Sequence, residues 1–242
     1  MAKTKGYLVV ASNKPNFYSS AINLIESIKD FDPVNPVCLV TEPRFIDKRA
    51  EVADQVIHCD KHYRAKLWGM ANSPYDVTMY VDADMECIHE DITTAFDQLG
   101  DADVMFTELT KEREYIYAER EFSTPEGPAR FTLCGAVCLY DRTNPLAKEF
   151  MDEWWELTRK QMGGEWWPEG YDKSLRTWDQ FSLWWLTERT DKYKDLKISI
   201  FEDDLRWNYF TAFDRVRTKP EKPIIMMHYS NAMNKDKDIR TL

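Results

Sequence analysis

The sequence predicts an α/β fold of three layers, in which helices cover both faces of a mostly parallel central sheet. Apolar runs of strand length alternate with longer segments of helical period along the first 107 residues. This order is typical of strand–helix–strand units. No linker rich in glycine, serine or proline divides the 242 residues. We therefore expect a single domain over residues 1–242.

The strands expected in the first half are short apolar runs, such as Tyr-Leu-Val-Val-Ala at residues 7–11. An unbroken apolar run predicts a strand that is buried on both faces, as in parallel sheets. Between these runs, apolar residues recur three and four positions apart, which predicts amphipathic helices. The predicted strands are residues 7–11, 36–40, 56–57, 77–81 and 104–107, and the predicted helices are residues 18–29, 45–53, 64–71 and 92–99.

The second half is less regular. Residues 111–130 have no clean period and contain two prolines and a glycine, which predicts a long loop. Residues 131–140 are expected to form a strand pair, or one strand broken at Gly135. The other expected elements are helices at 145–160 and 178–187, an aromatic loop at 162–171, and strands at 197–201 and 223–228.

Composition excludes some classes of function. The formal net charge is −10 and the sequence pI is about 5.0, so the overall field does not favour non-specific binding to polyanions, although a local basic groove is compatible with it. The five cysteines match neither a disulfide framework nor a zinc site, and we expect buried free thiols. No apolar segment approaches the roughly 20 residues of a membrane span, and the polar N-terminus has no signal-peptide pattern. We expect a cytoplasmic protein without a membrane span.

The motif with the clearest chemical meaning is Tyr80-Val-Asp-Ala-Asp84, at the end of the strand predicted at residues 77–81. Ligands bind outside the carboxyl ends of strands in such sheets. Two buried carboxylates are costly unless they are compensated, and Mg²⁺ or Mn²⁺ compensates them while leaving coordination positions for phosphate oxygens. Asp82 and Asp84 are therefore candidate metal ligands. The competing interpretation is an acidic turn that is solvated or caps a helix.

A second candidate ligand is His228, at the end of the strand predicted at residues 223–228. A single histidine is more often structural than a ligand. The ends of two strands can face each other across one crevice, however, and two aspartates with one histidine form a sensible Mn²⁺ site.

The order of these motifs resembles a family. A strand with a polar loop is followed by a helix bearing Lys66, the Asp-x-Asp motif, Cys134-Gly135, the segment Trp178-Asp-Gln-Phe, and a late strand ending in His228. This order is similar to the GT-A fold glycosyltransferases, and most of all to family eight, which includes glycogenin and bacterial galactosyltransferases. The resemblance covers roughly residues 7–234. It implies transfer of a sugar from a nucleotide-sugar donor, with UDP-sugar as the expected donor, Mn²⁺ or Mg²⁺ as the cofactor, and retention of anomeric configuration.

The resemblance also implies residue roles. Asp82, Asp84 and His228 match the family's metal ligands, and Ala83 lies between the two carboxylates in the donor-binding motif. Ala11 and Asn13 match the positions that hold the base and ribose. Lys66 matches a lysine near the donor phosphate or sugar. Asp179 and Gln180 match a catalytic element near the donor sugar and the acceptor, with Asp179 the candidate for stabilising oxocarbenium charge; Asp179 could instead, or in addition, cap the helix at 178–187. The positions that match are Ala11, Asn13, Lys66, Asp82, Ala83, Asp84, Asp179, Gln180 and His228.

The resemblance further implies a nucleotide-sugar half at about residues 1–110 and an acceptor half at about residues 111–242. The acceptor stays open: a saccharide, a protein, a lipid-linked glycan or a modified nucleic acid. Two departures affect the site. Asn231 stands where the family's terminal motif has glycine, and Lys235 comes one position late without a following proline. Cys134 replaces the usual asparagine or serine before Gly135.

Seven of the nine tryptophans lie between Trp154 and Trp185. Those inside predicted helices are expected to pack in the core. Trp166 and Trp167 lie in the aromatic loop, and we expect them to form an acceptor platform by stacking on a sugar ring or a base.

Three alternatives compete with the transferase hypothesis. A phosphatase of the haloacid dehalogenase type also uses Asp-x-Asp after a strand and could use Asp203 and Asp204 as further ligands; its motif normally lies near the start of the chain. A nucleotidyltransferase normally has a glycine-rich loop after the first strand, which is absent here. A non-catalytic carbohydrate-binding module would account for the tryptophans but not for the carboxylate pair.

Overall fold

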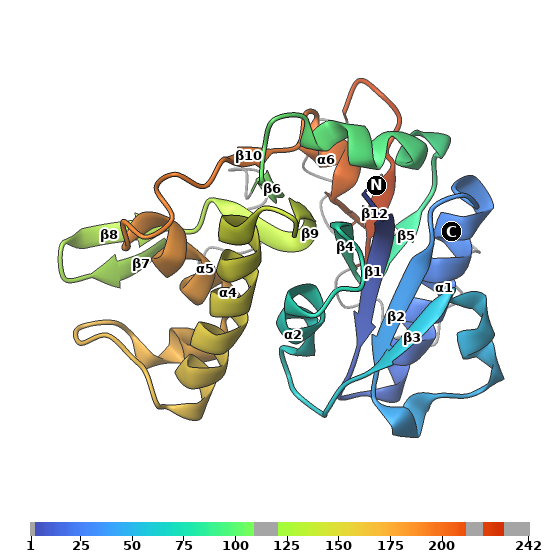
Figure 1. The fold of residues 1–242 in the computed structure, drawn as a ribbon. Helices are drawn as coiled ribbons and strands as arrows, with labels where there is room; N and C mark the ends of the chain where they lie inside the picture. Colours follow the sequence, from blue (N-terminus) through green and yellow to red (C-terminus); the bar gives the residue numbers. More distant parts are fainter. Residues whose placement is uncertain (1–2, 109–120, 212–219, 230–242) are drawn as a thin grey trace.

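A seven-stranded sheet forms the centre of the computed structural model, which describes residues 3–108, 121–211 and 220–229 (Figure 1). Its neighbouring strands pair in parallel except that β9 runs antiparallel to both β4 and β6. The predicted mostly parallel sheet is confirmed. The strand order is β10 (Ile198–Ile200), β6 (Val104–Glu108), β9 (Leu133–Asp141), β4 (Val77–Asp82), β1 (Lys5–Ala11), β2 (Val37–Thr41) and β3 (Gln55–His58).

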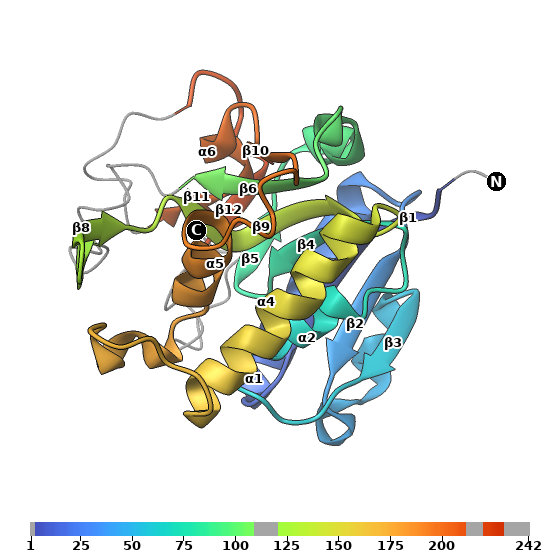
Figure 2. The same cartoon turned by 60° about the vertical axis from the view of Figure 1, so that its left-hand side comes forward.

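Helices cover both faces of this sheet, which gives the three predicted layers (Figure 2). Side chains alternate along β1, because successive residues of a strand point to opposite faces. Tyr7 and Val9 pack in the apolar cluster that includes α1 (Pro15–Phe31). Leu8 and Val10 pack in the opposite cluster with α2 (Ala65–Ala71) and α4 (Pro145–Gly163). Sheet strands buried on both faces explain why their sequences are continuously apolar.

Several expected elements differ from the structure. The helix predicted at 45–53 is two short 3₁₀ turns, η1 (Pro43–Phe45) and η2 (Lys48–Val52). The helix predicted at 92–99 is the 3₁₀ segment η3 (Glu90–Leu99). Of the predicted loop at 111–130, residues 111–120 lie outside the described part, and the rest is a hairpin of β7 (Glu121–Thr124) and β8 (Gly127–Arg130). A two-stranded hairpin has too short a pattern for periodicity to reveal.

Residues 133–141 form one strand, β9, and Gly135 does not break it. The register in which β6 pairs with β9 shifts between Phe106 and Thr107 of β6. Beyond this strand lie the 3₁₀ turn η5 (Lys173–Thr177) and the helix α5 (Asp179–Glu188).

A second, three-stranded sheet carries the end of the described chain. Its strands are β11 (Tyr209–Phe210), β12 (Met226–His228) and β5 (Met85–Cys87), and the short helix α6 (Asp204–Trp207) precedes β11. The strand predicted at 223–228 is therefore shorter than expected. It pairs antiparallel with β5, in a register that sets His228 opposite Met85. This pairing brings the end of the described chain to the Asp-x-Asp motif.

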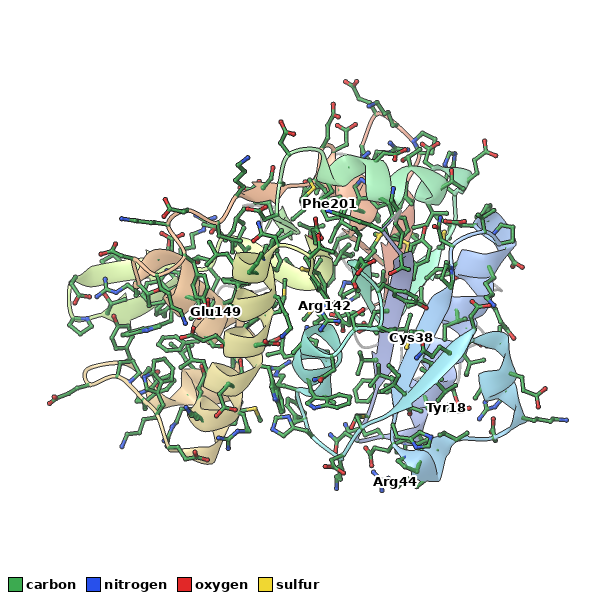
Figure 3. The ribbon with its side chains drawn as sticks, in the orientation of Figure 1. Tyr18, Cys38, Arg44, Arg142, Glu149 and Phe201 are labelled. Carbon is green, nitrogen blue, oxygen red and sulfur yellow. The ribbon has the colours of Figure 1, made fainter. Side chains whose placement is uncertain are left out.

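All five cysteines are buried free thiols, as expected. Cys38 on β2, labelled in Figure 3, lies in the apolar cluster between the sheet and α2. Burial raises the pKa of the Cys38 thiol to about 12, so the thiol stays protonated at neutral pH. Among the described residues, we find no helix that combines the length and the apolar character needed to cross a bilayer.

Candidate metal and nucleotide site

Three side chains of metal-ligand type converge at the carboxyl end of β4. Asp82 ends that strand, Asp84 lies two residues later, and β12 delivers His228 from the other side. One ligand atom from each of the three lies within 4.8 Å of the others. The Nε2 atom of His228 is 3.3 Å from the Oδ1 atom of Asp84. Two carboxylates and one imidazole form a donor set that suits Mn²⁺ and, with water ligands added, Mg²⁺.

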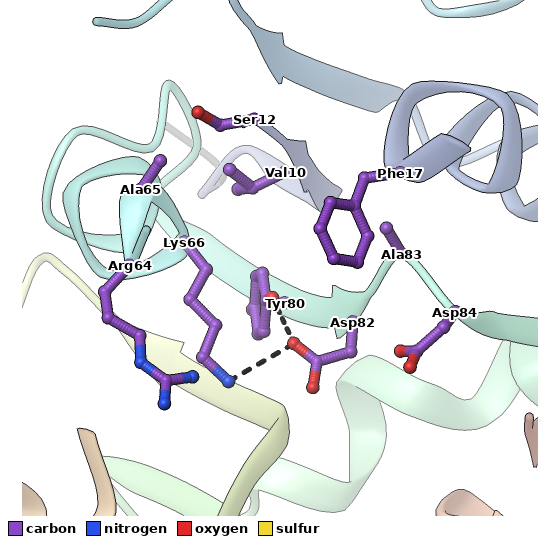
Figure 4. A pocket seen from close by; sticks show the side chains of 10 residues that line it. All are labelled: Val10, Ser12, Phe17, Arg64, Ala65, Lys66, Tyr80, Asp82, Ala83 and Asp84. Atoms are coloured by element: carbon purple, nitrogen blue, oxygen red, sulfur yellow. Dashed lines mark hydrogen bonds and ion pairs between the residues drawn. The ribbon is translucent and has the colours of Figure 1, made fainter. Parts of the chain in front are cut away.

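A pocket of about 170 Å³ opens beside these carboxylates (Figure 4). It lies at the ends of β1 and β4, where ligands bind in open α/β sheets. The start of α2 forms another wall and brings basic side chains opposite the acidic ones. The residues that line the pocket are Val10, Ser12, Phe17, Arg64, Ala65, Lys66, Tyr80, Asp82, Ala83 and Asp84.

Lys66 lies between two carboxylates. Its Nζ atom is 3.3 Å from Oδ1 of Asp82, 3.1 Å from Oδ2 of Asp179, and 3.3 Å from the carbonyl oxygen of Gly135. Burial alone lowers the pKa of Lys66, but the charges of Asp179 and Asp82 outweigh it and raise the pKa above its ordinary value. Lys66 therefore stays charged over the physiological range and can face an anionic ligand.

Asp179 receives a second cation from Arg64, which sequence reasoning missed. The Nη1 atom of Arg64 is 3.1 Å from Oδ1 of Asp179, and the same guanidinium donates to the carbonyl oxygen of Thr177 at 2.7 Å. Burial alone raises the pKa of Asp179, but Lys66 and Arg64 reverse the effect and hold it below its ordinary value. The residue before α5 is Trp178, so Asp179 stands in the first turn and does not cap the helix. The signal that could have found Arg64 was its position two residues before Lys66, at the N-cap of α2.

The hydroxyl of Tyr80 donates to Oδ1 of Asp82. Burial, followed by the nearby charge of Asp82, raises the pKa of Tyr80 well above its usual value, so the phenol keeps its proton.

The pKa values of Asp82 and Asp84 shift in opposite directions. Burial raises the pKa of Asp82, and the neighbouring Asp84 adds to this. Burial has the same tendency at Asp84, but His228 outweighs it, and the pKa of Asp84 is lowered.

Gln180 lies apart from this pocket, although it follows Asp179 in sequence. Adjacent residues of a helix point in different directions, and Gln180 lines a separate small cavity beside Leu133 and Trp184. Its Oε1 atom is buried and has no hydrogen-bond partner among the described residues.

The loop after β1 holds the two positions expected to meet the nucleotide. Ala11 is buried, and its carbonyl oxygen accepts from the Thr41 hydroxyl at 2.8 Å. Asn13 has a positive φ of 78°, a conformation that asparagine tolerates better than most residues. Neither side chain is among those that line the 170 Å³ pocket, although Ser12 between them is.

Glu42, at the end of β2, anchors this loop and was also missed. Its Oε1 atom accepts from the Ser12 hydroxyl at 2.8 Å and from the backbone N–H of Asn13, while Oε2 accepts from Arg44 at 2.7 Å. Burial alone raises the pKa of Glu42, but these hydrogen bonds outweigh it and lower the pKa. An acidic residue two positions after the strand predicted at residues 36–40 was the signal that could have found it.

We expect Glu42→Ala to loosen the loop after β1. The donors of Ser12 and Asn13 would lose their acceptor, at a cost of about 2 kcal/mol, or a Tm lowered by about 4–8 °C at neutral pH. Because the folded-state pKa of Glu42 is depressed, its contribution is full above the unfolded pKa of about 4.3 and is lost as pH falls through the folded value. The Tm difference from wild type, measured by calorimetry, should shrink below about pH 4. An equal difference at pH 3 and pH 7 would contradict this, and Glu42→Gln, which retains an acceptor oxygen, should lose less.

The expected acceptor platform is packed against other aromatic rings. Trp167 stacks on Phe181 with ring centroids 4.6 Å apart, and Trp166 meets Trp185 edge to face at 5.2 Å. Both indoles are partly buried against a cluster that includes Phe122. The Phe181 ring therefore occupies one face of Trp167. Stacking of an acceptor on the exposed parts of Trp166 and Trp167 stays a prediction.

Comparison with known proteins places the fold. No protein-family model matches the chain, and no curated protein matches its sequence. Among solved structures, the chain is similar to the glycosyltransferase GlyE of Streptococcus pneumoniae TIGR4, with 15% identity over 93% of this chain and 54% of that chain and a TM-score of 0.59. It is also similar to the galactosyltransferase LgtC, with 17% identity over 93% of this chain and 87% of that chain and a TM-score of 0.56.

The chain has the fold of these glycosyltransferases. A third structure, the bifunctional glycosyltransferase WbbM, agrees at 12% identity, 95% coverage of this chain and a TM-score of 0.58. The chain spans about half the length of GlyE and WbbM, and most of the length of LgtC. The GT-A fold expected from the order of motifs is thereby confirmed.

Proposed function

We propose that this protein is a metal-dependent glycosyltransferase that transfers a sugar from a nucleotide-diphosphate sugar, with UDP-sugar as the expected donor and retention of anomeric configuration. The observation that carries the proposal is the convergence of Asp82, Asp84 and His228 beside the cations Arg64 and Lys66 at the strand ends of a GT-A fold. This combination suits a diphosphate, with a metal for its oxygens and fixed positive charge beside it.

The donor set fits Mn²⁺ or Mg²⁺, and Asp82, Asp84 and His228 would hold it. The ion, when bound, supplies Lewis-acid neutralisation of the charge that develops on the leaving diphosphate. The raised pKa of Asp82 supports a metal site, because burial and the charge of Asp84 disfavour the ionised form even with Lys66 beside it, and a bound metal ion would offset them.

The other residues have roles that this geometry suggests. Lys66 would contact the donor phosphates or sugar from the wall of the pocket, with its ammonium held in place by Asp82 and Asp179. Asp179 would stabilise positive charge that develops on the donor sugar. Gln180 would need to turn out of its separate cavity to reach the same sugar. Its Oε1 atom has no hydrogen-bond partner among the described residues, so this turn would break no hydrogen bond of that atom.

The donor half would then comprise about residues 1–110, including Ala11, Asn13 and Ala83 at the nucleotide, and the acceptor half about residues 111–242. LgtC was solved with analogues of both a donor and an acceptor sugar, which supports a saccharide acceptor. The terminal positions Asn231 and Lys235 lie outside the described residues.

The phosphatase alternative receives no support from the later aspartates. Asp203 pairs with Lys222 at 2.8 Å, and Asp204 accepts the backbone N–H of Glu108 at 3.1 Å. Neither belongs to the cluster around Asp82 within the described part of the chain. A simple carbohydrate-binding module would leave the partly buried carboxylate pair unexplained.

Calorimetric titration tests the proposal. UDP, GDP, ADP and CDP are titrated with and without Mn²⁺ into wild type and Asp84→Ala. We expect one nucleotide diphosphate to bind in a metal-dependent manner, and this binding to disappear in the variant. If no nucleotide binds in the presence of metal, the transferase proposal is wrong and a phosphatase assay takes its place.

A further inference from the structure

A chain of buried polar groups extends from His228 into the protein, on the side away from the pocket. Asn208, which follows α6, is completely buried. Its Oδ1 atom is 2.9 Å from Nδ1 of His228. Its Nδ2 atom donates to the Thr107 hydroxyl at 2.9 Å and to the Cys134 sulfur at 3.4 Å. The side-chain amide of Asn208 thus contacts the Nδ1 side of the imidazole.

Strand register and ring stacking fix the orientation of these groups. The register shift on β6 sets Thr107 opposite Cys134 of β9, so both side chains reach Asn208. The ring of Phe210 stacks on the imidazole of His228, with centroids 4.0 Å apart and planes 28° apart. Rotation of the histidine would break this stacking and the amide contact together.

These contacts favour a proton on Nδ1 of the histidine. The amide nitrogen of Asn208 points to Thr107 and Cys134, so its oxygen faces Nδ1. In this orientation the amide oxygen only accepts, so its contact with Nδ1 is a hydrogen bond when Nδ1 carries the proton. The other nitrogen, Nε2, faces Asp84 and is the one that can exchange a proton for a metal ion.

We propose that Asn208 is a positioning residue for the metal site: it fixes the proton of His228 on Nδ1 and so leaves the lone pair of Nε2 for the ion. The inference rests on the proposed metal site. Neither the Asp-x-Asp motif nor the histidine reveals Asn208 as the residue that selects the histidine tautomer.

The first test measures the tautomer directly. Nitrogen-15 NMR of the imidazoles, in metal-free protein at about pH 9 where free histidine is neutral, distinguishes a proton on Nδ1 from one on Nε2. The chain has four histidines, and His228→Gln assigns the signal. We expect Nδ1–H in wild type and in Asn208→Asp, which keeps an acceptor oxygen. We expect Nε2–H in Asn208→Leu, which has similar size and no acceptor.

The second test measures affinity for Mn²⁺ alone, by electron paramagnetic resonance, without nucleotide. Loss of an outer partner of a metal-bound histidine typically weakens metal binding about 10–100-fold, and we expect this for Asn208→Leu. Asn208→Asp should restore most of the affinity. Thr107→Val removes only the hydroxyl that orients the amide, so it provides a milder variant, with a smaller loss of affinity than Asn208→Leu, should Asn208→Leu fail to fold.

Two results would overturn the inference: a neutral His228 in metal-free wild type that carries its proton on Nε2 instead of Nδ1, or unchanged Mn²⁺ affinity in both folded Asn208→Leu and Thr107→Val. Failure of the proposed function has a different signature. Wild type would then bind neither Mn²⁺ nor a nucleotide diphosphate, while the NMR measurement would still decide the tautomer.

Discussion

Asp82→Asn is expected to abolish metal-dependent nucleotide binding and, at the same time, to stabilise the metal-free protein. The substitution removes a carboxylate ligand, which we expect to weaken Mn²⁺-dependent nucleotide affinity about 10³-fold, equivalent to several kcal/mol. The pKa of Asp82 is raised in the folded protein, so its ionised form disfavours folding at neutral pH. The amide still accepts from Tyr80 without the charge. We therefore expect a higher Tm of the metal-free protein.

The matched variant is Asp84→Asn. It removes the same charge from the same site and should lose nucleotide affinity to a similar extent. The pKa of Asp84 is lowered by His228, so this carboxylate favours folding and its loss should reduce Tm. Calorimetry without metal and nucleotide titration with Mn²⁺ measure both effects. Equal Tm changes in the two variants, or retained metal-dependent binding in either, would contradict the site as described.

Lys66→Met is expected to reduce both catalysis and stability. The ammonium is the counter-charge of Asp82 and Asp179, and breaking a largely buried pair by removing one partner costs about 3 kcal/mol. Loss of a fixed cation beside the leaving diphosphate should lower the rate of donor hydrolysis, measured without acceptor, about 10²–10³-fold. Chemical denaturation and release of nucleotide diphosphate from UDP-sugars measure the two effects.

Lys61→Met is the matched control, because Lys61 is an exposed lysine in the loop that precedes α2. It should change neither stability nor hydrolysis appreciably. The double variant Lys66→Met with Asp179→Asn separates the two roles of Lys66. It should recover part of the stability, since a buried carboxylate no longer lacks its cation, and it should not recover hydrolysis. Recovery of hydrolysis would show that Lys66 acts only through Asp179.

The sequence by itself determined the strands, the layers and the carboxylate motif. Continuous apolar runs such as residues 7–11 report burial on both faces, and burial of that kind occurs in parallel sheets covered by helices. Asp82 was predictable as a strand-end residue because the apolar run stops there. The 3₁₀ character of residues 90–99 was not, because a period of three and one of 3.6 are hard to separate over ten residues.

Only the tertiary structure decided which groups meet. The pairing of β5 with β12 brings His228 to Asp84 across 144 positions of the chain, and no local pattern encodes that register. The cation pair around Asp179, the Glu42 anchor and the contact of Asn208 with His228 likewise depend on strands and helices distant in sequence. Helix geometry, in turn, separates Gln180 from Asp179. Sequence periodicity reports how deeply a residue is buried, whereas its partners depend on long-range pairing, and the chemistry of this site depends on the partners.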